Sequence, residues 1–157
     1  MTAPADTTRR FSSNVESRPR GGIRIGLPFD PEEVWGALDD YHVSGTVGGQ
    51  PFRGSLITGG VSVLELGPSW SRTPGFGVGD LVEIRMALEG PRSHTIGDDV
   101  NAAFRQDPGA ARFFDSMPTF YRNNAARVIA GAKRPETRAR RIAEVVDSAK
   151  RRKRWGE

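Results

Sequence analysis

The 157-residue sequence contains no cysteine, which removes several kinds of site at once. Without thiols the chain cannot form disulfide bonds, thiolate metal sites or a cysteine nucleophile. Its two histidines, His42 and His94, lie far apart in the sequence, whereas a structural zinc ion needs several ligands within reach. We therefore expect no metal site and no cofactor. A reducing compartment suits the lack of cysteine, so we expect the protein to be cytoplasmic.

Long hydrophobic runs are also missing. No segment approaches the roughly 18 apolar residues that a membrane-spanning helix needs, and residues 1–10 lack the apolar stretch of a signal peptide. These ten residues are small, polar and unpatterned, which predicts a disordered N-terminus. The sequence thus predicts no membrane insertion, and it indicates no particular oligomeric state.

Catalytic motifs are absent as well. The sequence has neither a G-x-S-x-G nucleophile elbow nor a G-x-x-x-x-G-K-[ST] phosphate loop. The glycines of residues 75–79 are not followed by the helix of a dinucleotide-binding motif. We therefore assign no catalytic residues. An enzyme whose site is assembled from distant residues remains an alternative.

Glycine and proline are abundant, with 19 and 11 residues, and they separate short alternating segments. The clearest segment is 41–55, in which two alternating runs flank Gly48-Gly49, a strong hairpin signal. Further strands are expected at 11–17, 23–27, 61–66, 81–88 and 93–96. About six or seven short strands with glycine turns predict a small closed antiparallel β-barrel over residues 11–97, because closure removes exposed edges.

A short helix is expected to interrupt the strands at residues 31–35. Asp30 is placed as its N-cap and Pro31 as its first residue. The negative charges of Glu32 and Glu33 interact favourably with the partial positive charge at the N-terminus of the helix. The start of the helix explains both glutamates, so they do not indicate a catalytic acid pair. Val34 and Trp35 are expected to pack inward.

The period becomes helical after residue 97. Asp98 and Asp99 can cap one helix, and Pro108, Pro118 and Pro135 each stand near the start of another. Apolar residues recur at helical spacing in each of these segments. The sequence therefore predicts an α+β fold, with the barrel followed by a C-terminal helical segment at 98–157.

The net charge of +4 is unevenly distributed. Residues 133–157 contain ten Lys and Arg against four Asp and Glu, whereas the preceding residues carry a small negative charge. Such a basic block can bind phosphates. One hypothesis is a nucleic-acid-binding or regulatory module that uses Arg138, Arg141 and residues 150–154. The alternative is a solvated helix face.

Two groups of residues are candidate binding sites. The long loop at 67–79 carries Trp70, Arg72 and Phe76, which could stack on a flat ligand at the barrel mouth beside Arg53. Alternatively, the two aromatic residues close the barrel end and Arg53 is a surface residue. The second candidate, an anion site, consists of Lys133, Arg138 and Arg141. These arginines could clamp an anion or fix the helix to the barrel.

The segments L-P-F-D-P-E-E-V-W-G, V-S-G-T-V-G-G-Q-P-F-R-G-S-L and G-V-G-D-L-V-E-I resemble a small bacterial β-barrel domain of unknown function. The segment from F-F-D-S-M-P to K-R-P-E-T-R-A-R-R-I resembles the YdeI/OmpD-associated, or bacteriocin-protection, helical segment. The resemblance implies a barrel with C-terminal helices, a cytoplasmic setting and a link to protection against antimicrobial peptides or stress. It carries no reaction. Ser69-Trp70-Ser71 stands where the family usually has basic residues.

These observations favour a non-enzymatic binding protein. It would hold a small molecule or peptide at the barrel mouth and protect the cell by sequestration, which would confer antibiotic resistance. Nucleic acid is the less favoured partner.

Overall fold

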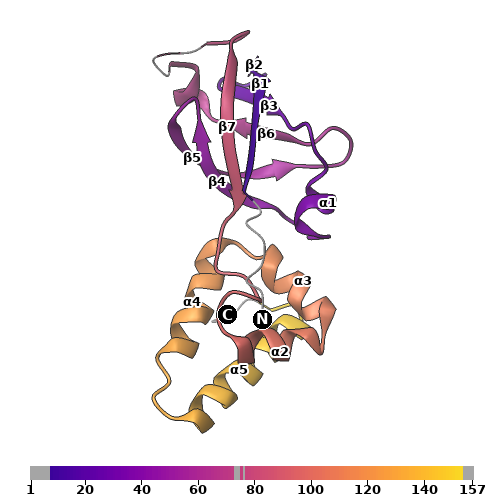
Figure 1. Ribbon diagram of the computed structural model, residues 1–157, viewed down its shortest axis with the longest axis vertical. Helices are drawn as coiled ribbons and strands as arrows, with labels where there is room; N and C mark the ends of the chain where they lie inside the picture. The colour runs from indigo at the N-terminus through magenta and orange to yellow at the C-terminus, as the bar shows by residue number, and fades with distance from the viewer. Residues whose placement is uncertain (1–7, 73–74, 76, 154–157) are drawn as a thin grey trace. The chain divides into compact units, whose positions relative to one another are not determined.

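The computed structural model describes residues 8–72, 75 and 77–153, and its contacts divide the chain into two compact units (Figure 1). The first, called the barrel unit, comprises the described residues up to Ala37 together with Tyr41–Leu88. The second, called the helical unit, comprises Leu38–Asp40 and the described residues from Glu89 onward.

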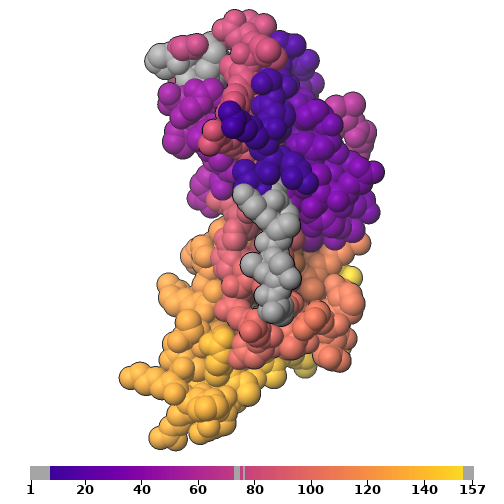
Figure 2. All heavy atoms as spheres, viewed as in Figure 1, coloured from indigo at the N-terminus to yellow at the C-terminus, as the bar shows by residue number. Residues whose placement is uncertain are grey.

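The described part of the barrel unit forms a seven-stranded antiparallel sheet in the order β1-β7-β4-β5-β6-β3-β2. Figures 1 and 2 show β1 beside β7, and Ser13 Oγ donates a 3.1 Å hydrogen bond to the Gly26 carbonyl, which joins β1 to β3. The sheet is therefore a nearly closed barrel, and the predicted α+β fold class is confirmed. The strands are β1 (Arg9–Asn14), β2 (Glu16–Ser17), β3 (Ile23–Gly26), β4 (His42–Val47), β5 (Gln50–Ile57), β6 (Val63–Leu66) and β7 (Leu81–Leu88).

Side chains along each strand point alternately into the barrel core and toward its outer face. Buried positions alternate with exposed ones along β7, where Val82, Ile84 and Met86 point inward. The predicted hairpin is present as β4 and β5. Within β4, Gly45 has a φ of +157°, and a Cβ there would collide with the Arg85 carbonyl oxygen. Glycine is therefore required where β4 passes close to β7.

Helix α1 (Pro31–Trp35) begins as the sequence predicts. The Asp30 side chain accepts a 2.9 Å hydrogen bond from the Glu32 backbone N–H. Trp35 is buried and packs edge-on against Phe29, with ring centroids 5.4 Å apart. The neighbouring Val34 is only half-buried, so Trp35 is the main anchor of this helix in the core.

The described part of the helical unit contains α2 (Asp98–Arg105), α3 (Pro108–Ser116), α4 (Thr119–Ala130) and α5 (Pro135–Lys150). These helices pack around one apolar cluster that includes Phe104, Phe114, Ile129 and Val145. None of the helices in the described ranges is both long enough and apolar enough to cross a bilayer. The four predicted helices are confirmed.

Three expectations about element boundaries need correction. Residues 93–96 form a turn instead of a final strand, because Ser93 bonds the Asp115 carboxylate through both its N–H, at 2.7 Å, and its Oγ, at 2.8 Å. Strand β1 already begins at Arg9, within the stretch expected to be disordered, and residues 1–7 lie outside the described residues. Finally, the N-cap of α2 is Gly97 instead of an aspartate, although Asp99 Oδ1 accepts a 2.9 Å hydrogen bond from the Val100 N–H in the first turn.

A buried arginine organises the start of the helical unit. The Arg122 side chain is only 1% exposed. Its Nη1 donates to the carbonyls of Glu89, at 2.6 Å, and Pro91, at 2.5 Å. Its Nε donates to the Met117 carbonyl, at 3.0 Å, and its Nη2 to Thr119 Oγ1, also at 3.0 Å. One side chain thus ties residues 89–91 to the start of α4.

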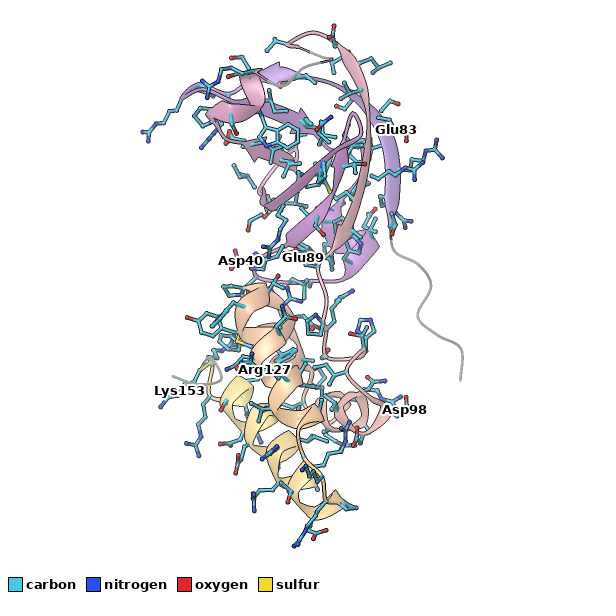
Figure 3. All side chains as sticks on the ribbon, turned by 90° about the vertical axis from the view of Figure 1, so that its left-hand side faces the viewer. Asp40, Glu83, Glu89, Asp98, Arg127 and Lys153 are labelled. Atoms are coloured by element: carbon cyan, nitrogen blue, oxygen red, sulfur yellow. The ribbon has the colours of Figure 1, made fainter. Side chains whose placement is uncertain are left out.

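Replacement of Arg122 should therefore destabilise the helical unit strongly. Arg122→Met keeps much of the volume but leaves one buried and two partly buried carbonyls without their donors, and we expect a loss of about 3 kcal/mol in the free energy of unfolding. The measurement is denaturant unfolding followed by circular dichroism. Arg127→Met is the control, because Arg127 lies exposed on the same helix (Figure 3), and a change below about 0.5 kcal/mol is expected there. Equal losses in the two variants would contradict this role of Arg122.

Candidate ligand-binding site

A pocket of about 310 Å³ opens on the barrel unit beside the turn that joins β2 to β3. Five residues from this turn and from strands β3 and β6 line it: Arg18, Pro19, Arg20, Arg24 and Glu65. The lining therefore brings three guanidinium groups and one carboxylate together.

Backbone hydrogen bonds fix the shape of the turn. The Gly21 N–H donates to the Arg18 carbonyl at 3.0 Å, and the Arg18 N–H donates to the Gly22 carbonyl at 3.2 Å. Gly22 has a φ of +101°, and a Cβ there would collide with the Leu66 carbonyl oxygen. The turn thus lies directly against the end of β6, and only glycine permits this approach.

The strand register places Arg24 opposite Glu65. These residues pair across β3 and β6, and their side chains point outward because the flanking residues Ile23 and Ile25 are buried in the core. Glu65 Oε2 lies 3.4 Å from Arg24 Nη2 and 3.8 Å from Arg18 Nε. Both distances exceed those of a strong charge-assisted hydrogen bond, about 2.7–2.9 Å, so Glu65 holds the two arginines loosely.

Some N–H donors of the pocket arginines have no acceptor within the described part of the protein. The Arg24 Nε–H is buried, and it has no hydrogen-bond acceptor among the residues that the structure describes. Glu16 pairs with Arg24 on its other side in the ladder, but it is exposed and does not line the pocket. With three positive groups against one negative group, the arrangement attracts anions and can offer them forked N–H donors.

The structure does not gather the predicted ligand-binding residues in this pocket. Arg53 lies on the exposed side of β5, opposite Ser44 in the ladder. Trp70 and Arg72 belong to the 3-10 helix η1 (Pro68–Arg72), where Trp70 is half-buried and Arg72 is exposed. Phe76 lies outside the described residues. A ligand-binding role for these four residues remains a prediction.

Helix η1 nevertheless borders the pocket turn. A Cβ added to Gly21 would lie 3.5 Å from the side chain of Pro68, the first residue of η1. Trp70 therefore stands two positions along the chain from a residue that contacts the turn, where its indole can report on changes there.

The predicted anion site in the helical unit is already engaged by the protein. Arg138 Nε and Nη2 donate to the two Asp99 carboxylate oxygens, at 2.6 Å and 3.0 Å, and Arg141 Nη1 donates to the Val128 carbonyl at 2.8 Å. Arg138 therefore fixes α5 to α2, whereas the sequence had suggested attachment to the barrel as the alternative. Lys133 is exposed between α4 and α5. An anion-binding role for the three remains a prediction.

The basic end of α5 also has partners nearby. Lys150 Nζ lies 3.9 Å from an Asp107 carboxylate oxygen, and Arg151 Nε lies 3.1 Å from one of Asp147. Residues 154–157 are outside the described ranges. Part of the positive charge that suggested nucleic-acid binding is thus balanced within the helical unit.

Both histidines have defined surroundings. His42 Nδ1 lies 3.0 Å from Ser55 Oγ. This is the distance found between a catalytic nucleophile and its base. It also follows simply from the pairing of His42 with Ser55 across β4 and β5. Burial lowers the pKa of His94, the charge of Arg92 lowers it further, and Asp115 opposes both effects. Within the described ranges, the structure shows no group of three or more side chains suited to hold a metal ion.

Sequence reasoning overlooked the pocket residues. The glycine pair at 21–22 marks a turn, and alternation along 23–27 places Arg24 on the face opposite Ile23 and Ile25, but neither pattern by itself indicates a binding site. The available signal was the spacing R-P-R-G-G-I-R, which places three arginines around a glycine turn. The contribution of Glu65 has no local signal, because it depends on which strand pairs with β3.

Comparison with known proteins identifies a fusion of two domains, a barrel and a helical segment. Residues 11–86 match the family model described as Domain of unknown function (DUF1905). Residues 94–152 match the model described as Bacteriocin-protection, YdeI or OmpD-Associated. The two matches lie in the order that the sequence predicted, and no curated protein matches the chain.

The Arg138–Asp99 pair predicts a pH effect. Hydrogen bonds from Arg138 hold the pKa of the Asp99 carboxyl below its usual value. A carboxyl with a lowered pKa stabilises the folded state above its unfolded pKa, and that stabilisation is lost as the pH falls through the lowered value. We expect Arg138→Gln to return the pKa of Asp99 toward its usual range, as measured by carboxyl-carbon NMR titration.

Lys133→Gln provides the control for this titration. It removes one positive charge from the same exposed region, but Arg138 remains to bond Asp99. The pKa of Asp99 should then stay close to that of the unaltered protein. An unchanged pKa in Arg138→Gln would show that the pair has no effect in solution.

Proposed function

We propose that the protein is a non-enzymatic binding protein that holds a small molecule or peptide on its barrel unit. Sequestration of this ligand would protect the cell that makes the protein. The observation that carries the proposal is the polar pocket beside the β2–β3 turn, with arginine donors left unsatisfied by the fold. The pocket thus takes the place of the barrel mouth as the proposed site.

The size and rigidity of the pocket support this proposal. Its volume of about 310 Å³ lies at the lower end of the range for small-molecule sites. Two backbone hydrogen bonds and the contact of Gly22 with β6 hold the turn in place. A preformed site loses little conformational entropy when a ligand binds, which favours affinity.

The family description supports the protective role. The helical segment matches a model described as Bacteriocin-protection, and the fusion of this segment to a barrel with a pocket suggests that one chain links recognition to protection. Trp70 and Arg72 on η1 would contribute from beside the turn, and Arg53 from the outer face of β5.

A thermal-shift screen against antibiotics and antimicrobial peptides tests this function. A true ligand should raise the melting temperature progressively with concentration, because it binds the folded state in preference to the unfolded one. It should also change tryptophan fluorescence, and Trp70→Phe should diminish that change.

Two variants locate the binding in this screen. Arg20→Gln, at the exposed tip of the pocket turn, should reduce the shift, whereas Arg127→Gln, on α4 of the helical unit, should leave it unchanged. If no ligand class raises the melting temperature or alters the fluorescence, the proposed function is wrong.

A further inference from the structure

We infer that the pocket binds the dianionic phosphate group of a small phosphate monoester, and that Glu65 occupies part of the phosphate's place when the site is empty. This inference rests on the proposed binding function and names the chemical class of its ligand. It follows from the donors, charges and distances of the pocket residues.

Arg24 has donors that the fold leaves unused. Its Nη2 reaches Glu65 only at 3.4 Å, and its buried Nε–H has no acceptor among the described residues. A buried donor without a partner destabilises the folded state. An oxyanion in the place of the Glu65 carboxylate would accept from Arg24 Nη2, and it would also accept from Nε once the side chain turns to expose that donor.

The other two arginines have unused donors as well. Arg18 Nε lies 3.8 Å from Glu65, too far for a hydrogen bond. Arg20 is exposed at the tip of the turn and has no ion pair within the described part of the chain. Three guanidinium groups offer about fifteen N–H donors, whereas one carboxylate provides about four acceptor sites.

Charge selects the class of anion. The lining carries three positive charges and one negative charge, an excess that a dianion neutralises and a monoanion does not. A phosphate monoester also presents three acceptor oxygens in a tetrahedral arrangement, which can face arginines from the turn and from β3 together.

The position of Glu65 explains how the site stays organised without a ligand. Its carboxylate is 17% exposed and lies between Arg18 and Arg24, so it limits their mutual repulsion. For the same reason it competes with an incoming anion. Its removal should therefore strengthen anion binding, which is the opposite of the usual effect of deleting a pocket residue.

Isothermal titration calorimetry with inorganic phosphate at constant ionic strength tests the inference in the full chain. Glu65→Gln should tighten binding by about fivefold or more, and Arg20→Gln and Arg24→Gln should each weaken it by about fivefold or more, since charge-assisted bonds are gained or lost. Glu16→Gln is the matched control. It removes an equal charge beside Arg24 outside the pocket lining, and we expect a change of less than about twofold.

Three further titrations define the ligand. Ribose 5-phosphate, a dianionic monoester, should bind at least as tightly as inorganic phosphate. Acetate and dimethyl phosphate carry one charge and should bind more weakly, and dimethyl phosphate represents the diester found in nucleic acids and in many lipids. Equal binding of dimethyl phosphate and inorganic phosphate would overturn the assignment to monoesters.

The inference is overturned if the four variants Glu65→Gln, Arg20→Gln, Arg24→Gln and Glu16→Gln all bind phosphate with the affinity of the unaltered protein. It is also overturned if neither the unaltered protein nor Glu65→Gln binds phosphate. Arg20 lies in an exposed turn, so Arg20→Gln keeps the test valid even if Arg24→Gln does not fold. A ligand found in the thermal-shift screen that is insensitive to Glu65→Gln and Arg24→Gln would preserve the proposed function and overturn the phosphate site. Phosphate binding with the expected variant pattern, but without any hit in that screen, would support the site and remove the protective function.

Discussion

The pairing register between β3 and β6 is the constraint on which the proposed site depends. Ile23 and Ile25 must face the barrel core, so Arg24 between them faces outward. The same alternation turns Glu65 outward, directly opposite Arg24. A shift of one residue would send these charges into the core and expose the isoleucines. Burial of apolar side chains thus fixes the position of the charged ones, and the glycine turn then brings two more arginines to the same place.

Arg122 and Arg138 of the helical unit differ from Arg18 and Arg24 of the barrel unit in how fully their donors are bonded. In the helical unit, Arg122 is buried and donates to backbone carbonyls on all sides, and Arg138 forms two short bonds with Asp99. Burial lowers the pKa of Arg122, while nearby Asp115 and Glu89 oppose this effect. On the barrel, Arg18 and Arg24 share one distant carboxylate. Arg122 and Arg138 thus stabilise the helical unit, whereas the proposed phosphate site depends on donors of Arg18 and Arg24 that Glu65 does not fully occupy.

Most of the fold could be predicted because its signals are local. The Gly48-Gly49 hairpin, the Asp30 cap and the prolines at helix starts each depend on residues only a few positions apart. The expected strand at 93–96 was wrong because a contact with Asp115, more than twenty residues away, holds that segment as a turn. The pocket could not be predicted for a similar reason: Arg24 and Glu65 meet only through strand pairing. Trp70 and Arg53 were predicted as binding residues from their immediate sequence neighbours. No local pattern of this kind connects Arg24 with Glu65.

The resonances of arginine side-chain Nε–H groups during a phosphate titration test the central claim most directly. If the β3–β6 register holds an oxyanion site, the Arg24 Nε–H signal shifts with phosphate concentration, because this buried donor gains an acceptor. The Arg138 signal should stay in place, since its donors already bond Asp99. A titration that moves Arg138 or Arg141 and leaves Arg24 unchanged would contradict the assignment.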